Sequence, residues 1–197
     1  MDDSSFCFIN AHLAAGQSQT SQRNIDAAVI VKTASFKSIE TQQVDYFASG
    51  GDGSRVFDHH YCFIAGDLNY RIDYPRNSVM DCISQRNWKK LSNHDQLNRQ
   101  RAESRSFVLG IFKENPIDFA PTYKYAVNRD FYEEAPKFRI PAYCDRILWK
   151  GENIVQHSYG RYEPDISDHR PIAATFEIPV WKRDMTKYFM VRNELGF

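Results

Sequence analysis

The stretch Tyr61-Cys62-Phe63-Ile64-Ala65-Gly66-Asp67-Leu68-Asn69-Tyr70-Arg71 places polar groups at the end of an apolar run. The run over residues 61–65 is typical of a strand that is covered on both faces. Asp67 follows a glycine that lets the backbone turn closely, and a carboxylate there can accept a proton from water. Asn69 lies two residues further on the same side of an extended segment, where it can orient that water or donate to a phosphate oxygen. An isolated Gly-Asp-x-Asn string is more often a turn held by the aspartate, so other motifs must decide between these interpretations.

Two later strings supply matching groups: Pro141-Ala142-Tyr143-Cys144-Asp145-Arg146-Ile147-Leu148 and Ser167-Asp168-His169-Arg170-Pro171. Asp145 can hold the imidazole of His169, fix its tautomer and favour its protonated form, which then binds phosphate. With Asp67, these groups are suited to metal-assisted attack of water on a phosphate ester. The structural alternatives are an edge-strand Asp145 paired with Arg146, and an Asp168 that caps a turn.

Together with Phe6-Cys7-Phe8-Ile9-Asn10-Ala11-His12-Leu13-Ala14-Ala15-Gly16, these strings resemble the inositol polyphosphate 5-phosphatases. These enzymes are a branch of the endonuclease/exonuclease/phosphatase superfamily, and the resemblance covers about residues 5–178. It implies Mg²⁺ as the cofactor, Asp168 as a carboxylate beside the metal, and a catalytic set consisting of His12, Asp67, Asn69, Asp145 and His169. Without the resemblance, a lone histidine such as His12 is more often a packed or solvent-bridging residue.

A segment rich in tyrosine and lysine distinguishes a phosphoinositide enzyme from a nuclease of the same superfamily. Tyr123 and Lys124, followed by Lys137 and Arg139, resemble the family's recognition segment for an inositol 4-phosphate. Lysine, arginine and phenol groups suit a phosphate that is recognised without being cleaved. Arg71 is also expected to face the site. Taken alone, the segment reads as a basic, solvated loop.

The family's catalytic domain also has a front section that carries a metal-binding Glu and a metal-proximal Asn. The chain therefore resembles the C-terminal part of that domain, and the resemblance implies an N-terminally incomplete fold. We expect hydrolysis by the 197-residue chain to be impaired for this reason.

The net charge of the chain indicates which kinds of partner it attracts. Lys plus Arg and Asp plus Glu both number 25, so the formal net charge is zero. A neutral chain has no overall attraction for polyanions, and we expect no nucleic-acid partner. The sequence does not identify a protein partner.

The four cysteines show no C-x-x-C spacing and lie beside apolar residues, which favours buried, reduced thiols in a cytoplasmic protein.

The longest apolar runs fall short of the about 18–20 residues that span a bilayer. The acidic start Met1-Asp2-Asp3 does not resemble a secretory signal. We therefore expect a cytoplasmic protein that makes transient, peripheral contact with membrane surfaces.

Apolar periodicity predicts strands alternating with helices, followed by late antiparallel strands, which is a mixed α/β pattern. The resemblance sharpens this to a DNase I-like, four-layer α/β/β/α sandwich. We expect a catalytic-domain part over 1–180 and a helical extension over 181–197. The expected strands are 5–10, 61–65, 144–150, 153–159 and 171–178, and the expected helices are 19–36, one from Asn77, 88–103 and 182–193, with a long ordered loop over 115–143.

Three functions are consistent with these residues. The leading one is Mg²⁺-dependent removal of the 5-phosphate from phosphoinositides, with phosphatidylinositol 4,5-bisphosphate as the best substrate and soluble inositol polyphosphates as further candidates. The second is a non-catalytic remnant that binds polyphosphates or a protein partner. The third is a superfamily nuclease, which predicts an extended basic surface and steep salt dependence that a neutral chain does not favour.

Overall fold

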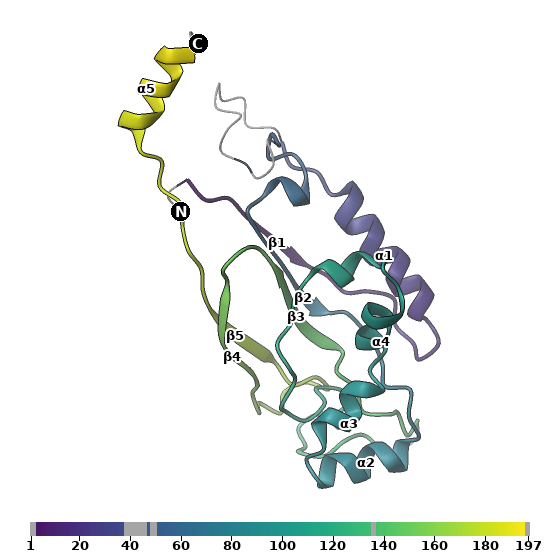
Figure 1. Ribbon diagram of the computed structural model, residues 1–197. Helices are drawn as coiled ribbons and strands as arrows, with labels where there is room; N and C mark the ends of the chain where they lie inside the picture. Colours follow the sequence, from purple (N-terminus) through teal and green to yellow (C-terminus); the bar gives the residue numbers. More distant parts are fainter. Residues whose placement is uncertain (1–2, 38–46, 48–50, 135–136, 196–197) are drawn as a thin grey trace.

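Two small sheets form the centre of the molecule (Figure 1). The computed structural model describes residues 3–37, 47, 51–134 and 137–195. Strands β1 (Phe6–Asn10), β2 (Tyr61–Asp67) and β3 (Asp145–Lys150) form one sheet in the order β1-β2-β3. β1 and β2 are parallel, whereas β2 and β3 are antiparallel. Strands β4 (Val155–Arg161) and β5 (Ile172–Glu177) form a second, antiparallel sheet.

Both faces of the three-stranded sheet carry apolar side chains that pack against another layer, although Phe8 of β1 remains 72% exposed. On one face, helix α1 (Thr20–Thr33) buries Ala27 and Val31 in a cluster that includes Cys62 and Ile64 of β2. On the opposite face, Phe63 of β2 and Trp149 of β3 meet Phe176 of β5. Alternate residues of a strand point to opposite faces, so the nearly continuous apolar run of β2 fills both interfaces.

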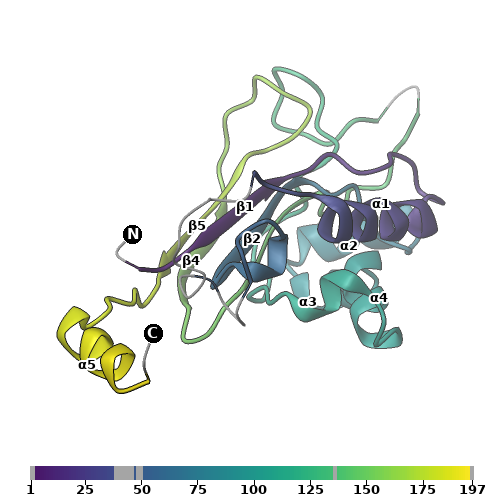
Figure 2. The ribbon, with the colours of Figure 1, turned by 90° about the horizontal axis from the view of Figure 1, so that it is seen from above.

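The remaining helices lie on the same side of the strands as α1, apart from the last one (Figure 2). They are α2 (Arg76–Ser84), α3 (Trp88–Asn93) and α4 (Gln96–Glu103), with short 3-10 turns η3 (Val56–Asp58) and η4 (Val108–Ile111). Helix α5 (Met185–Leu195) stands apart from the sheets in both views. No helix among the described residues is long and apolar enough to cross a membrane.

The expected strands and helices are confirmed to within a few residues, with one exception. The expected helix over 88–103 is wrong, because the chain breaks at His94 and Asp95 and forms α3 and α4 instead. Asp95 is extended, and its carboxylate accepts a hydrogen bond from the Asn98 backbone N–H at 3.0 Å as the N-cap of α4. The same carboxylate accepts a hydrogen bond from Arg146 at 2.9 Å. The break in the helix therefore places a buried negative charge beside a buried cation.

The long loop over 115–143 is confirmed in its described part, which holds only isolated bridges such as Tyr123 with Ala142. All four cysteines are buried free thiols, as expected. The helices and the two sheets supply three of the four expected layers. The outer face of the β4–β5 sheet remains exposed at Ala173, Thr175 and Glu177.

A buried ion cluster joins β3 to the helices. Arg146 donates to Asp95 at 2.9 Å and to both oxygens of Glu114, at 2.8 and 2.6 Å. Tyr159 of β4 also donates to Glu114, at 2.8 Å. The side chains of Arg146 and Asp95 are 0% exposed and that of Glu114 is 2% exposed. Burial of ions is costly, so the cluster is stable only while its charges remain paired.

We predict that Arg146→Leu destabilises the fold by about 3–5 kcal/mol, because it leaves the buried Asp95 without its cation and leaves Glu114 with the more distant Arg101, at 3.7 Å. Urea unfolding would measure this change in free energy. Arg99→Leu is the matched control, since Arg99 is 46% exposed and its pairs with Asp73 and Glu103 are solvent-screened. The control should lose less than about 1 kcal/mol. Equal effects of the two substitutions would show that the buried cluster contributes nothing special.

Candidate active site

The ends of β2 and β3 bring two carboxylates face to face. In the antiparallel register Asp67 lies opposite Asp145, although the two residues are far apart in the sequence. Both side chains are largely buried, with exposed fractions of 19% and 17%. Like charges placed opposite each other destabilise a strand pair, so a cation must lie between them for the pair to be stable.

His169 supplies that cation. Its Nδ1 lies 2.9 Å from Asp145 Oδ2, and its Nε2 lies 3.8 Å from Asp67 Oδ2. The hydroxyl of Thr122, which is fully buried, donates to the same oxygen of Asp145 at 2.6 Å. Because Asp145 accepts from both groups, Nδ1 of His169 carries a proton and Nε2 faces the space beside Asp67.

The electrostatics of the cluster support an acid–base role. Burial raises the pKa of Asp67, and its near neighbour Asp145 adds to the shift, although His169 and His12 oppose it. Burial works against the charged form of His169, but the hydrogen bond and charge of Asp145 outweigh it and raise the pKa of the imidazole. A carboxylate with a raised pKa beside a stabilised imidazolium is typical of catalytic sites.

His12 reaches the same carboxylate from the loop after β1. Its Nε2 lies 3.4 Å from Asp67 Oδ2, and the side chain is 72% exposed. Backbone hydrogen bonds of 3.0 Å from Ala11 to Ala65 and from Leu13 to Asp67 hold this loop against the end of β2. Gly66 has a φ of +129°, and a Cβ there would lie 2.3 Å from the Ala11 carbonyl oxygen. Only glycine permits this approach, which brings His12 to the site.

Asn69 is deeply buried. Its side chain is 2% exposed, its amide nitrogen donates to the Leu13 carbonyl at 3.0 Å, and its amide oxygen accepts from Arg71. Its backbone N–H donates to Asp67 Oδ1 at 3.0 Å. Arg71 is itself buried and lies over the Tyr123 ring at 4.5 Å. In this structure both residues tie the Asp67 turn to its neighbours, and their expected contact with substrate remains a prediction.

The expected phosphate-recognition residues differ in how open they are. Tyr123 is 5% exposed, and its hydroxyl accepts from Arg139 at 2.6 Å. Lys124 is paired with Asp168, whereas Lys137 is exposed. Arg139 also lies 3.9 Å from Glu133 and keeps 36% of its side chain in solvent. Lys137 and Arg139 are therefore the more open cations, whereas the Lys124 side chain is 17% exposed and already paired with Asp168, and Tyr123 contacts Arg139.

Asp168 lies outside the carboxylate–imidazole cluster, although it was expected beside the metal. Partial burial tends to raise the pKa of Asp168, but the hydrogen bond and charge of Lys124 lower it. Its second oxygen accepts a long hydrogen bond from the Ser167 hydroxyl, at 3.5 Å. The ligand atoms of Asp67, Asp145 and His169 lie within 4.8 Å of one another. A protonated His169 has no free lone pair for a metal, so this cluster is an acid–base group, and Asp168 as the carboxylate beside the metal remains a prediction.

Sequence reasoning missed Thr122 and Gln96 as supporting residues. Gln96 is 4% exposed and accepts from the Arg71 backbone at 2.9 Å and from Arg23 at 2.5 Å. Its amide nitrogen donates to Gln17 and Asp73. Neither residue type signals such a role, because a polar side chain in a helix or loop is usually solvated.

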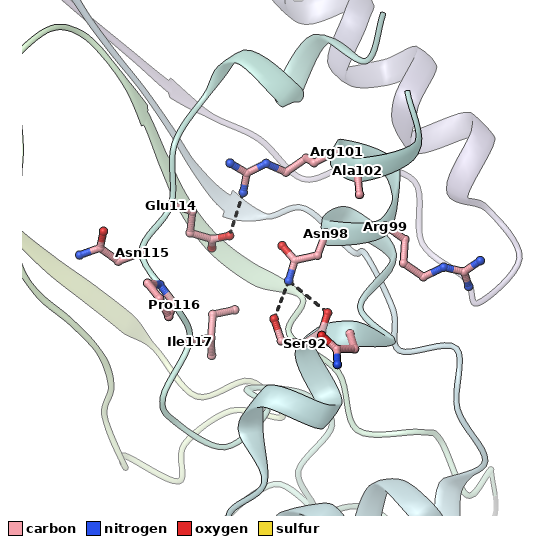
Figure 3. A pocket seen from close by; sticks show the side chains of 10 residues that line it. Ser92, Asn98, Arg99, Arg101, Ala102, Glu114, Asn115, Pro116 and Ile117 are labelled. Atoms are coloured by element: carbon pink, nitrogen blue, oxygen red, sulfur yellow. Dashed lines mark hydrogen bonds and ion pairs between the residues drawn. The ribbon is translucent and has the colours of Figure 1, made fainter. Parts of the chain in front are cut away.

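A separate cavity of about 580 Å³ lies between α3, α4 and residues 114–117 (Figure 3). The close-up shows that two pairs of its polar side chains bind each other. Asn98 donates to the Ser92 carbonyl and hydroxyl, and Arg101 lies 3.7 Å from Glu114. None of the expected site residues lines this cavity, so it is distinct from the candidate active site.

Comparison with known proteins identifies the family. Residues 1–175 match endonuclease/exonuclease/phosphatase family 2. The chain belongs to this family. Among family relatives, a probable inositol polyphosphate 5-phosphatase of Schizosaccharomyces pombe is 46% identical over 178 residues, covering 88% of this chain and 15% of that protein. A type I inositol polyphosphate 5-phosphatase of Arabidopsis thaliana is 39% identical, covering 95% of this chain and 35% of that protein.

A solved structure confirms the DNase I-like class. The inositol polyphosphate 5-phosphatase domain of SPsynaptojanin, in complex with inositol (1,4)-bisphosphate and a calcium ion, superposes with a TM-score of 0.85 at 38% identity. The match covers 98% of this chain and 53% of that domain, so the chain spans about half the length of the solved relative. Together with the curated relatives, this match confirms the expected resemblance to the inositol polyphosphate 5-phosphatases.

We predict that Asp145→Asn lowers the pKa of His169, because the substitution removes the negative charge that outweighs burial. The folded-state pKa of His169 is raised, so its charge persists to higher pH than that of an ordinary histidine. In the variant the imidazole should lose its proton at a lower pH. NMR titration of the His169 ring would measure this change, with the exposed His157 as an internal control. An unchanged His169 titration would contradict the pairing.

Proposed function

We propose that this chain carries a phosphoinositide 5-phosphatase site that removes the 5-phosphate of phosphatidylinositol 4,5-bisphosphate with Mg²⁺, and acts on soluble inositol polyphosphates as well. The observation that carries the proposal is the Asp67–His169–Asp145 cluster, with the Tyr123 ring 4.8 Å from that of His169 and Arg139 on the Tyr123 hydroxyl. Curated relatives of this chain are inositol polyphosphate 5-phosphatases, one of them described as probable. The relatives are longer than this chain, so we propose impaired activity for the chain alone.

The base of the reaction is Asp67. Its Oδ1 is engaged by the backbone of Asn69 at 3.0 Å, which leaves Oδ2 directed toward the two imidazoles. A water held near Oδ2 can transfer its proton to the carboxylate as it attacks phosphorus. The raised pKa of Asp67, caused mainly by burial, increases its affinity for that proton.

The two histidines bind the phosphate oxygens. His169, held in its protonated form by Asp145, directs Nε2 toward the same space as Asp67. His12, which is mostly exposed, can approach a phosphate from the solvent side. Cations fixed in advance around the reacting phosphate stabilise the charge of the transition state without reorganisation.

A bound Mg²⁺ would polarise a phosphate oxygen and lower the pKa of a coordinated water. Asp168 fits this ion through the oxygen that Lys124 does not engage. The further contacts of such an ion would be water and the substrate's phosphates.

A Mg²⁺ titration with three readouts tests the proposal. Metal-dependent, saturable phosphate release from phosphatidylinositol 4,5-bisphosphate would support it. Binding of inositol polyphosphate with no release at any Mg²⁺ concentration would overturn catalysis and favour a polyphosphate-binding remnant. Nicking of plasmid DNA without phosphate release would identify a nuclease instead.

The proposed setting is the cytoplasm, with transient contact at membrane surfaces, where the lipid substrate resides. The headgroup is the proposed partner, and nucleic acid is not. The formal net charge of zero supports this choice, since it gives no overall attraction for polyanions.

We predict that Asp67→Asn reduces phosphate release by about 10²–10⁴-fold, because asparagine has a similar shape but cannot accept the proton. Binding of the substrate should persist, since no cation is lost. Measurement of kcat and of Kd separates the two effects. Asp118→Asn, at an exposed aspartate, is the control and should retain full activity. Near-normal turnover by Asp67→Asn would remove Asp67 from its role.

We predict that Lys124→Ala and Lys137→Ala each lower kcat/KM at least about tenfold for substrates with a 4-phosphate, since each loses a charge-assisted hydrogen bond. Analogues without that phosphate should change little. Lys89→Ala, at an exposed lysine of α3, should leave both substrates unaffected. If both substrate types suffer equally, the segment has a structural role and confers no specificity.

A further inference from the structure

A cavity of about 470 Å³ opens beside the candidate active site. Residues 15–17, from the loop that follows His12, line it together with Arg71, Tyr123 and residues 138–140. These lining segments come from distant parts of the chain. The shape of the cavity therefore depends on contacts that join one segment to another.

Gln96 of α4 binds two of these lining segments at once. Its side-chain oxygen accepts from the Arg71 backbone N–H at 2.9 Å, and its amide nitrogen donates to the Gln17 carbonyl at 3.0 Å. Gln96 itself is 4% exposed and does not line the cavity, so its amide reaches both segments from the interior. One buried side chain therefore fixes the separation between Arg71 and Gln17.

Both ends of the Gln96 amide are fully used. Its oxygen also accepts from Arg23 at 2.5 Å, and its nitrogen also donates to Asp73 Oδ1 at 2.7 Å. A primary amide offers two donor hydrogens and one acceptor oxygen with two lone pairs, so four contacts satisfy it and define one orientation. A side chain that lacks the donor end or the acceptor end cannot reproduce this arrangement.

Further hydrogen bonds hold the loop that contains Gln17. Arg23 is 0% exposed and donates to the carbonyls of Ala14 and Gly16 at 3.0 and 2.7 Å. The Gln17 side chain donates to the Ile72 carbonyl at 3.0 Å. This loop is therefore held by hydrogen bonds, which are directional and fix its orientation as well as its position.

On the other side, contacts extend from Arg71 to an expected phosphate-binding cation. The Arg71 guanidinium lies 4.5 Å from the centre of the Tyr123 ring, and the Tyr123 hydroxyl accepts from Arg139 at 2.6 Å. Arg139 keeps 36% of its side chain in solvent. A shift of the Arg71 backbone would therefore reach Arg139 through two contacts.

We propose that Gln96 is a positioning residue for substrate recognition, which holds the Gln17 loop and the Arg71–Tyr123–Arg139 contacts at the separation that an inositol polyphosphate requires. The role in recognition rests on the proposed function, because that function supplies the ligand. Gln96 does not line the cavity and acts through Arg71 and Gln17. Small displacements of groups that bind a substrate are costly, even when their cause lies outside the site.

The test compares Gln96→Met with a matched control on the same helix. Gln96→Met removes all four hydrogen bonds of the amide and keeps an unbranched side chain. The control is Gln100→Met, since Gln100 accepts from Asn24 of α1 at 2.6 Å but does not line the cavity. Gln96→Glu is a second variant that retains the volume and the acceptor oxygen. It loses only the donor end, so it tests the link to Gln17 even if Gln96→Met folds poorly.

Amide hydrogen exchange, followed by NMR, tests the positioning without any ligand. In Gln96→Met, exchange at Ala14 and Asp73 should become about tenfold faster, because these N–H groups lie in the two segments that Gln96 joins but donate to other partners. The amides of β2 should exchange as in the wild type, and Gln100→Met should leave all of these rates unchanged. Equal acceleration in β2 would indicate a general loss of stability and would overturn the positioning role.

Calorimetric titration with inositol 1,4-bisphosphate measures recognition without turnover. Gln96→Met should raise the Kd about tenfold, because a displaced Arg139 loses a charge-assisted hydrogen bond to phosphate. Gln100→Met should bind like the wild type. An unchanged Kd in Gln96→Met, or equal weakening in both variants, would contradict the proposal.

Kinetics on inositol 1,4,5-trisphosphate separate positioning from partial unfolding. In Gln96→Met the KM should rise about tenfold with kcat nearly unchanged, since Gln96 acts on the recognition groups and not on Asp67 or His169. A smaller folded fraction would instead lower kcat and leave KM unchanged, and that result would reject the proposal. If the wild type neither binds the bisphosphate nor releases phosphate, the proposed function fails, while the exchange readout still decides whether Gln96 holds the two segments.

Discussion

The register between β2 and β3 is the constraint on which the site depends. It places Asp67 opposite Asp145 at the ends of two buried strands, in an arrangement that like charges oppose. His169 lies between the two carboxylates and offsets their repulsion. The Thr122 hydroxyl stabilises the charge of Asp145 by donating a hydrogen bond to it. A slip of one residue would turn each carboxylate to the other face of the sheet. Packing of β2 on both faces prevents that slip, so the core of the sheet and the geometry of the site are specified together.

Successive side chains of strand β3 point to opposite faces of the sheet and contribute to the contacts on both. Asp145 points to the site, whereas its neighbour Arg146 points to the helices and joins Asp95 and Glu114. Asp95 in turn begins α4, which carries Gln96 against the backbone of Arg71. The helical layer is therefore fastened to the site by polar contacts as well as by apolar packing. Because these polar groups are buried, each must keep a well-aligned hydrogen-bond partner to avoid a cost in stability.

Much of this arrangement could be predicted from the sequence, because strand ends carry recognisable signals. The apolar run that ends at Gly66 and Asp67, and the string around Asp145, placed both carboxylates correctly at strand ends. The break at Asp95 could not be predicted, because a polar helix pattern does not reveal that one aspartate has a buried partner 51 residues away. The burial of Asn69 could not be predicted for the same reason. Its residue type shows which hydrogen bonds the side chain can make, but not which partners it finds in the fold.

The parallel pairing of β1 with β2 joins strands on either side of α1, and β3 enters only after the long 115–143 segment. Contacts of this kind close large loops of chain, and topologies rich in them form slowly compared with local ones. No two of Asp67, Asp145 and His169 come from the same strand or loop, so no local fragment can assemble the cluster. The chemistry of this site therefore requires the ends of β2 and β3 and the β4–β5 loop to have come together.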